Sequence, residues 1–234
     1  MKIVSSTNGG ASWSTPTVVI DAFETSDLPV DRPWVQVDKS SGPYAGRIYV
    51  TSKNYEDGIT TDHVYMKYSS DGGVSWSSLD ILDDSIPCDL ITSMGCLAIG
   101  ADGSVNVMYI SWHLAQSFFV RAVMVKSTDG GVTFTPYIVQ QLPAATAIND
   151  TLQGSTYLGA NPTNPLNLVG IYTSNINGDA DILSVYSNDG GMTWAQTPIR
   201  VNDDPIANGN QQDMCWAGFS PNGTFCAAWR DRRN

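Results

Sequence analysis

An eight-residue motif occurs four times along the chain and constrains its fold more than any other feature. Each copy reads Ser, any residue, Asp or Asn, Gly, Gly, any residue, Ser or Thr, and finally Trp or Phe. The copies span residues 6–13, 69–76, 127–134 and 187–194. The motif recurs about every 60 residues, and such a period indicates one structural unit per repeat. The chain is therefore expected to be built from several similar units.

The chemistry of the motif is that of a hairpin turn. Its third residue can accept hydrogen bonds from backbone N–H groups further along the turn. These third residues are Asn8, Asp71, Asp129 and Asp189. The two glycines supply positive φ angles, and the Ser or Thr hydroxyl can bond across the turn. The aromatic residue that closes each copy is expected to pack beneath the turn, as an anchor for the hairpin. These closing residues are Trp13, Trp76, Phe134 and Trp194.

Composition favours strands over helices. The chain contains 21 Gly and 12 Pro, and its only glutamates are Glu24 and Glu56. Because turn-forming residues are abundant and strong helix formers are scarce, an all-β chain is predicted. Apolar runs between the motifs predict strands at 17–20, 34–38, 47–52, 62–68, 96–100, 105–112, 118–126, 156–160, 166–173, 181–186, 215–219 and 224–229.

The four motifs are Asp boxes, and the whole chain resembles the Asp-box (bacterial neuraminidase repeat) proteins of the sialidase-like β-propeller superfamily. The resemblance implies blades of four antiparallel strands, in which each box joins the third strand to the fourth. Blades are then expected at 31–83, 93–142 and 155–202, with partial blades at 1–20 and 212–234, in one domain of about four blades' worth of sheet. Two arrangements follow: a four-bladed ring closed by a composite blade from both termini, or, as we favour, part of a six-bladed ring.

The resemblance also implies a set of site residues. A sialidase holds the carboxylate of its substrate with three arginines, protonates the leaving group with an aspartate, and attacks through a tyrosine assisted by a glutamate. Arg32 lies at the start of an innermost strand, where one of these arginines is expected, and Asp57 lies in the loop expected to carry the acid. Arg230 matches a second arginine, and Asp213 falls near the position of the glutamate. The third arginine and the tyrosine would come from beyond residue 234, or the chemistry is absent.

Three further residues are candidates for substrate contact on the same face. They are Glu56, Asp62 and His113, which lie in loops between predicted strands. Each candidate also has a structural interpretation, because arginines near Asp31 and Asp231 commonly form ion pairs and loop carboxylates are usually solvated.

Charge and composition limit the partners. The formal net charge of -11 argues against DNA, RNA and anionic membrane surfaces, which bind clustered Lys and Arg. No apolar run approaches a membrane span, so no membrane insertion is expected. A glycan or glycoprotein is the expected partner, at an extracellular or periplasmic location with a secretion signal outside this chain. The sequence leaves the oligomeric state open.

Cofactor candidates are few. With two histidines and no Cys-x-x-Cys pair, the sequence predicts no structural zinc site. The oxygen-rich segment 175–181 has some character of a calcium loop, but it lacks the order of an EF-hand, and a turn is the favoured interpretation. Two close pairs of cysteines could form disulfides or remain buried thiols, and these are Cys88 with Cys96 and Cys215 with Cys226.

Two functions remain open. The first is a sialidase-like exo-glycosidase that holds an anionic sugar with arginines on the face opposite the Asp boxes. The second is a non-catalytic propeller that binds glycans or proteins, which the missing glutamate and the incomplete arginine set favour. A smaller alternative is another glycosidase chemistry that uses paired aspartates.

Overall fold

The computed structural model describes residues 1–21, 24, 30–54, 63–83, 96–111, 120–142 and 156–233. These residues form strands and turns, and no helix long and apolar enough to cross a membrane is found among them. The strands are β1 (Lys2–Ile3), β2 (Thr17–Val18), β3 (Val30–Val37), β4 (Ile48–Asn54), β5 (Val64–Ser69), β6 (Asp80–Ile81), β7 (Cys96–Ile99), β8 (Val105–Ser111), β9 (Val120–Ser127), β10 (Thr135–Leu142), β11 (Thr156–Ala160), β12 (Leu168–Ser174), β13 (Asp181–Ser187), β14 (Ile199–Arg200), β15 (Gln212–Phe219) and β16 (Phe225–Asp231).

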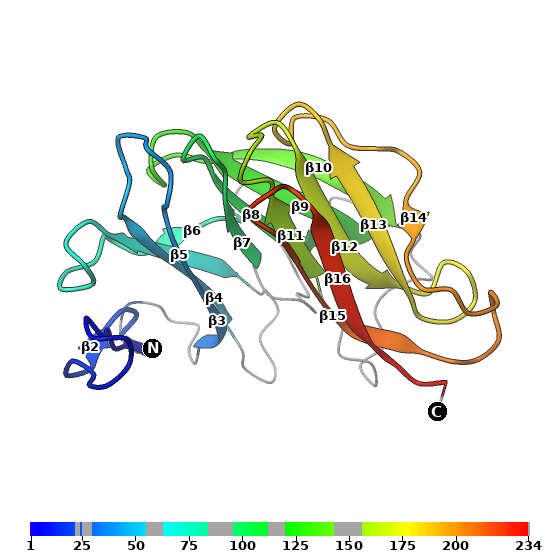
Figure 1. Ribbon diagram of the computed structural model, residues 1–234, viewed down its shortest axis with the longest axis horizontal. Helices are drawn as coiled ribbons and strands as arrows, with labels where there is room; N and C mark the ends of the chain where they lie inside the picture. Colours follow the sequence, from blue (N-terminus) through cyan, green and yellow to red (C-terminus); the bar gives the residue numbers. More distant parts are fainter. Residues whose placement is uncertain are drawn as a thin grey trace.

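The strands form antiparallel sheets in sequence order, which confirms the predicted fold class (Figure 1). Three sheets have four strands each, in the orders β3-β4-β5-β6, β7-β8-β9-β10 and β11-β12-β13-β14. The remaining strands form two separate two-stranded sheets, β1-β2 and β15-β16. In Figure 1 the N- and C-termini lie toward opposite ends of the long axis.

The sheets stack face against face, and their first strands follow one another in the order β3, β7, β11 and β15. Packing on both faces buries nearly every residue of the second strands β4, β8 and β12. The main hydrophobic cluster runs through all three four-stranded sheets and includes Tyr49, Tyr109 and Tyr172, whose side chains are fully buried. Such burial on both faces explains why the apolar residues of these strands are not confined to alternate positions.

The Asp boxes join the third strand of a sheet to the fourth, and their carboxylates organise the turn. In the third box, Asp129 accepts hydrogen bonds from the backbone N–H of Thr133 at 2.9 Å, from the Thr133 hydroxyl at 2.6 Å and from the Ser127 hydroxyl at 2.7 Å. The same contacts recur at Asp71 and Asp189. Hydrogen bonds from the Ser75 hydroxyl and from Thr193 lower the pKa of Asp71 and Asp189 to about 2.

The third and fourth boxes also contact the preceding sheet. Arg47, whose guanidinium lies over the rings of Tyr44 and Tyr68, donates a hydrogen bond to the carbonyl oxygen of Gly130 at 2.5 Å. One sheet further on, the Lys126 ammonium donates to the carbonyl oxygen of Gly190 at 2.7 Å. The boxes therefore join neighbouring sheets as well as neighbouring strands.

The expectation that an aromatic residue packs beneath every box is wrong for the first copy. Trp194 is buried and Trp76 and Phe134 are half-buried, but Trp13 is 63% exposed. The reason is that the first box belongs to the two-stranded sheet β1-β2. A Cβ added at Gly10 would meet only Trp13 within 4 Å, so no other described part of the chain covers this turn.

Candidate functional site

The sequence-predicted site residues that the structure describes lie at the end of the molecule opposite the boxes. Antiparallel pairing places the start of each first strand beside the end of the second, so Asp31 lies opposite Lys53 and Asp213 opposite Arg230. The boxes follow the third strands and lie at the other end of the sheets. Arg32 and Arg230 are thus on the face where the resemblance expects the ligand.

Two of the first strands, β3 and β15, carry the same bulge at this end. Pairing shifts between Asp31 and Trp34 in β3, and between Asp213 and Trp216 in β15. The residue after each aspartate has a positive φ, 52° at Arg32 and 51° at Met214. Positive φ is uncommon for residues other than glycine and recurs at functional sites. Because strand bulges redirect side chains, the repeated bulge changes the direction of the side chains at this end of both strands.

Asp213 holds two arginines at this opening. Its carboxylate is fully buried, and it accepts hydrogen bonds from Nε and Nη2 of Arg230 at 2.6 Å each and from Nη2 of Arg232 at 2.9 Å. The arginine side chains remain 46% and 42% exposed. Burial alone would raise the pKa of Asp213, but hydrogen bonds and charge from Arg230 and Arg232 outweigh it and hold the pKa below its usual value.

Two guanidinium groups share the carboxylate of Asp213, whereas the adjacent Arg233 is shared by two carboxylates, those of Asp231 and Asp203. Asp213 engages Nε and Nη2 of Arg230, and Nη1 makes no hydrogen bond within the described part of the chain. A guanidinium fixed in this way can present its remaining N–H groups to an anionic ligand. The hydrogen bonds with Asp213 also raise the pKa of Arg230, which therefore stays charged.

Arg32 lies beside Asp31. Its backbone N–H donates to the Asp31 carboxylate at 2.7 Å, and its Nε lies 3.5 Å from the same carboxylate. Both side chains are partly exposed, at 34% for Arg32 and 44% for Asp31. Four other predicted residues, Glu56, Asp57, Asp62 and His113, lie outside the described residues.

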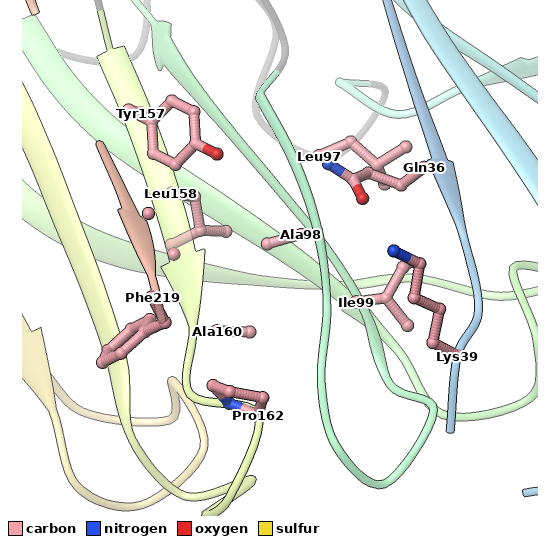
Figure 2. Close-up of a pocket in the computed structure, with 12 residues that line it drawn as sticks. Gln36, Lys39, Leu97, Ala98, Ile99, Tyr157, Leu158, Ala160, Pro162 and Phe219 are labelled. Carbon is pink, nitrogen blue, oxygen red and sulfur yellow. The ribbon is translucent and has the colours of Figure 1, made fainter. Parts of the chain in front are cut away.

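Three aromatic side chains from the first strands pack together near the middle of these strands. Trp34 stacks on Trp216 with ring centroids 4.7 Å apart. The ring of Tyr157 packs against both, with its centroid 5.4 Å from that of Trp34 and 5.3 Å from that of Trp216. A cavity of about 280 Å³ lies beyond this cluster, toward the boxes, and first strands line it (Figure 2). In Figure 2, Gln36 and Lys39 face Leu158 and Phe219 across the cavity. The aromatic cluster thus lies between this cavity and the end of the sheets that carries Arg32, Asp213 and Arg230, which we call the arginine-bearing end.

Polar residues that the sequence analysis missed also occupy the arginine-bearing end. His63, the residue before β5, lies with its Nδ1 3.0 Å from Oδ2 of the buried Asp83. Arg200 forms ion pairs of 2.8 Å with Asp181 and with Asp204, both fully buried. Asp204 follows Arg200 by four residues, but Asp181 and Asp83 lie 19 and 20 residues from their partners, and pairing of the strands brings them together.

The segment 175–181 forms a hydrogen-bonded turn. The N–H of Gly178 donates to the carbonyl oxygen of Asn175 at 3.0 Å, and the Asn177 amide donates to Asp181 at 2.6 Å. Among the described residues there is no group of three or more His, Cys, Asp or Glu side chains placed to hold a metal ion.

The cysteine pair Cys215 and Cys226 does not form a disulfide. Both are free thiols, as is Cys96, and Cys226 lies opposite Gly218 on the exposed side of β16. Cys215 lies within the bulge of β15 and packs into the apolar cluster with Ile171. The two thiols therefore face different surroundings. Cys88 lies outside the described residues.

Comparisons with known proteins agree with the repeat and the fold. The BNR/Asp-box repeat model matches residues 185–196, and no curated protein matches the chain. A Hadza microbial sialidase structure has a TM-score of 0.58 at 18% identity, over 84% of this chain and 39% of that one. The intramolecular trans-sialidase from Ruminococcus gnavus has a TM-score of 0.56 at 15% identity, over 89% of this chain and 65% of that one. An alpha-L-arabinanase from Penicillium chrysogenum has a TM-score of 0.54 at 17% identity, over 86% and 57%.

The chain thus matches less than two thirds of the length of each of these structures. At such low identity the likeness concerns the fold, and function has to be argued from the site. The repeat, the sheet order and the structural neighbours agree that this chain contains Asp-box repeats and has the sialidase-like β-propeller fold.

Proposed function

We propose that this protein acts on glycans that carry an anionic sugar, as an exo-glycosidase of the sialidase type. The observation that carries the proposal is the arginine pair on Asp213, in which Arg230 is oriented by a buried carboxylate and still exposed. A protein of net charge -11 repels anions in general, so a carboxylate sugar must be attracted by a local cationic group. Arg230 and Arg232 supply such a group, and Arg32 lies at the same end of the sheets.

In this proposal Asp213 is a positioning residue. A carboxylate that is held by two arginines, with its pKa lowered, is a weak base and stays ionised. It fixes the plane of the Arg230 guanidinium, so that the unused N–H groups point toward a ligand carboxylate. The proposal gives Asp57 the role of general acid and gives Glu56, Asp62 and His113 contacts with the glycan. An extracellular or periplasmic location is part of the same proposal.

A second candidate function is glycan binding without catalysis. Asp213 is the predicted catalytic residue that the structure describes, and its contacts suit it to holding arginines better than to moving protons. A site that binds an anionic sugar but lacks a base would retain the glycan unchanged. The two functions share the arginine contacts and differ in turnover.

The experiment is hydrolysis of a fluorogenic α-sialoside by the wild type, Arg230→Met, Asp213→Asn and, as a control at the box end, Arg47→Lys. We expect Arg230→Met to lose most of the activity, because a bidentate charged contact contributes several kcal/mol. Asp213→Asn should raise KM more than it lowers kcat, and Arg47→Lys should behave as wild type. Sialoside binding without turnover would favour the second function, whereas turnover unaffected by Arg230→Met would exclude this arginine from the site.

A further inference from the structure

A buried carboxylate at the box end of the β3-β6 sheet has no counterion. Asp38, the residue after β3, is 2% exposed. Its Oδ1 accepts a hydrogen bond from the backbone N–H of Ser40 at 2.8 Å, but its Oδ2 is buried without a hydrogen-bond partner in the described part of the chain. Burying an ionised carboxylate is costly unless hydrogen bonds or an opposite charge compensate it. Oδ2 of Asp38 therefore calls for a further partner.

The chain has no basic side chain to serve as this partner. All 12 lysines and arginines lie within the described residues, and none of them donates a hydrogen bond to Oδ2 of Asp38. Arg47, at the same end of the sheet, is engaged by Ser70 through Nε and by the carbonyl oxygen of Gly130 through Nη1. The side chain of Lys39 lines the cavity of Figure 2. We therefore expect the compensating charge to come from a bound cation.

Oxygen atoms from two neighbouring sheets border a space next to Oδ2. A Cβ placed on Gly103, in the turn between β7 and β8, would lie 3.3 Å from Oδ2 of Asp38 and 3.0 Å from Oγ of Ser40. A Cβ placed on Gly42 would lie 3.2 Å from the same Oγ and 3.5 Å from the carbonyl oxygen of Asp102. The two glycines thus leave room beside three oxygen atoms. We call Asp38, Ser40, Gly42, Asp102 and Gly103 the inter-sheet cradle.

The same arrangement recurs between β11 and β15 without the charge. Asn161 is the residue after β11, and Gly223 occupies the position in the β15-β16 turn that Gly103 occupies in the β7-β8 turn. A Cβ placed on Gly223 would lie 3.1 Å from Oγ1 of Thr163 and 3.3 Å from the amide of Asn161. Oδ1 of Asn161 accepts hydrogen bonds from the backbone N–H and the hydroxyl of Thr163, at 2.9 and 2.8 Å. A neutral amide is thus sufficient to form this loop, and Asp38 adds a charge that the loop does not require.

We propose that the inter-sheet cradle binds a calcium ion. Carboxylate, hydroxyl and carbonyl oxygens are the ligands that Ca²⁺ prefers, and water molecules would complete its shell of about six to eight oxygens. Oδ2 of Asp38 supplies the charged ligand, and Oγ of Ser40 and the carbonyl oxygen of Asp102 supply neutral ones. Metals that select thiolate or imidazole ligands do not match this donor set.

The bound ion would join two sheets at the box end. Asp38 and Ser40 belong to the loop between β3 and β4, and Asp102 belongs to the turn between β7 and β8 of the next sheet. A site with one carboxylate is expected to bind calcium weakly, with a Kd of about 10⁻⁴ to 10⁻³ M, as extracellular calcium modules do. Such a site would fill at the extracellular or periplasmic location proposed above.

The experiment is thermal unfolding of the full chain at 0.15 M salt, after treatment with a chelator, with and without added calcium chloride. Calcium at about 10 times its Kd should raise the melting temperature of a chain of this size by about 3 to 6 °C. Asp38→Asn, which makes the loop resemble that of Asn161, should abolish this rise. Without calcium, Asp38→Asn should melt at or above the temperature of the wild type, because it removes a buried charge that has no partner.

Asp189→Asn is the matched control at the same end of the sheets. Both oxygens of this box carboxylate already accept hydrogen bonds, from Ser187 and from Thr193. We therefore expect Asp189→Asn to keep the full rise with calcium. Calorimetric titration gives a second measurement, which should find one calcium ion per chain for the wild type and none for Asp38→Asn.

Three results would overturn the proposal. If calcium does not change the melting temperature of the wild type, water satisfies Oδ2 of Asp38. An equal rise with magnesium chloride at the same ionic strength would mean that general screening of the net charge of -11 causes the effect. A rise that persists in Asp38→Asn would place the ion elsewhere. Its loss in Asp179→Asn would then locate the ion at segment 175–181, where Oδ1 of the buried Asp179 also has no hydrogen-bond partner among the described residues.

Discussion

Trp34 of β3 and Trp216 of β15 stack with ring centroids 4.7 Å apart and ring planes inclined by 13°. The two strands are far apart in the sequence, because β3 begins the first of the stacked sheets and β15 begins the last. Each tryptophan follows the same bulge, and each lies three residues after an aspartate at the arginine-bearing end. The stack therefore joins the first and the last of these strands, between the arginine-bearing end and the cavity near the boxes.

The two partners of this stack should differ in their effect on stability. Trp34→Ala removes a side chain that is 7% exposed, and we expect it to lower the free energy of unfolding by about 3 to 5 kcal/mol. Trp216→Ala removes a side chain that is 56% exposed and should cost about 1 kcal/mol. Urea unfolding followed by circular dichroism measures both values. Equal losses would mean that Trp216 is buried in solution.

Replacing a box glycine by alanine should lower stability to an extent that depends on the space around that glycine. Gly191 has a φ of 91°, and a Cβ there would meet Met124 and lie 2.9 Å from Leu168. Gly9 has a φ of 72°, but a Cβ there would meet nothing within 4 Å. Gly191→Ala combines backbone strain with overpacking and should cost about 2 to 4 kcal/mol, against about 1 kcal/mol for Gly9→Ala. Thermal unfolding of the two variants tests this, and similar melting temperatures would contradict it.

The box carboxylate should act mainly as a hydrogen-bond acceptor. Asp129→Ala leaves the N–H groups of Val132 and Thr133 without their partner and should cost about 1 to 3 kcal/mol. Asp129→Asn should cost less, because the natural Asn8 accepts the corresponding hydrogen bond from the backbone N–H of Ser12 at 2.9 Å. Denaturant titration of both variants measures the free energy of unfolding that each one loses. If Asp129→Asn lost as much as Asp129→Ala, the negative charge would be the essential property.

Stability should fall in acid because of the same boxes. The pKa of Asp71 and Asp189 is lowered from 3.8 to about 2 by hydrogen bonds from Ser75 and Thr193. A lowered folded-state pKa contributes stability that is fully present above the unfolded value and is lost as the pH falls through the folded value. We expect a constant melting temperature down to about pH 5 and a decline from about pH 4 to about pH 2. The Asp71→Asn, Asp189→Asn double variant should show a shallower decline, and an unchanged slope would locate the effect elsewhere.

The fold could be predicted because the Asp boxes are local. One octet contains the acceptor, the glycines and the hydroxyl that make the turn, so its sequence reports its structure without reference to distant residues. The exposure of Trp13 could not be predicted in this way, because it depends on the sheet that packs over the box. Cysteine spacing was equally uninformative, since the register of β15 and β16 places Cys226 opposite Gly218 and not opposite Cys215.

The candidate site could be predicted only in part from the sequence. The resemblance led to Arg230 and Asp213, and the structure joins them in one ion pair. It did not reveal that Arg232 shares the same carboxylate, or that His63 lies against Asp83. These contacts depend on which strand ends meet at one end of the sheets, and that information is absent from local sequence patterns.

The measurement that tests the central claim most directly is ligand-induced thermal stabilisation. The wild type and Arg230→Met are melted with N-acetylneuraminic acid and with the neutral sugar arabinobiose. A ligand at about 100 times its Kd adds about 2.7 kcal/mol of stability, which a melting curve resolves. We predict that the acidic sugar raises the melting temperature of the wild type, that Arg230→Met loses this shift, and that arabinobiose has no effect on either. A shift with arabinobiose alone, or an acidic-sugar shift that persists in Arg230→Met, would contradict the assignment of Arg230 to an anionic sugar.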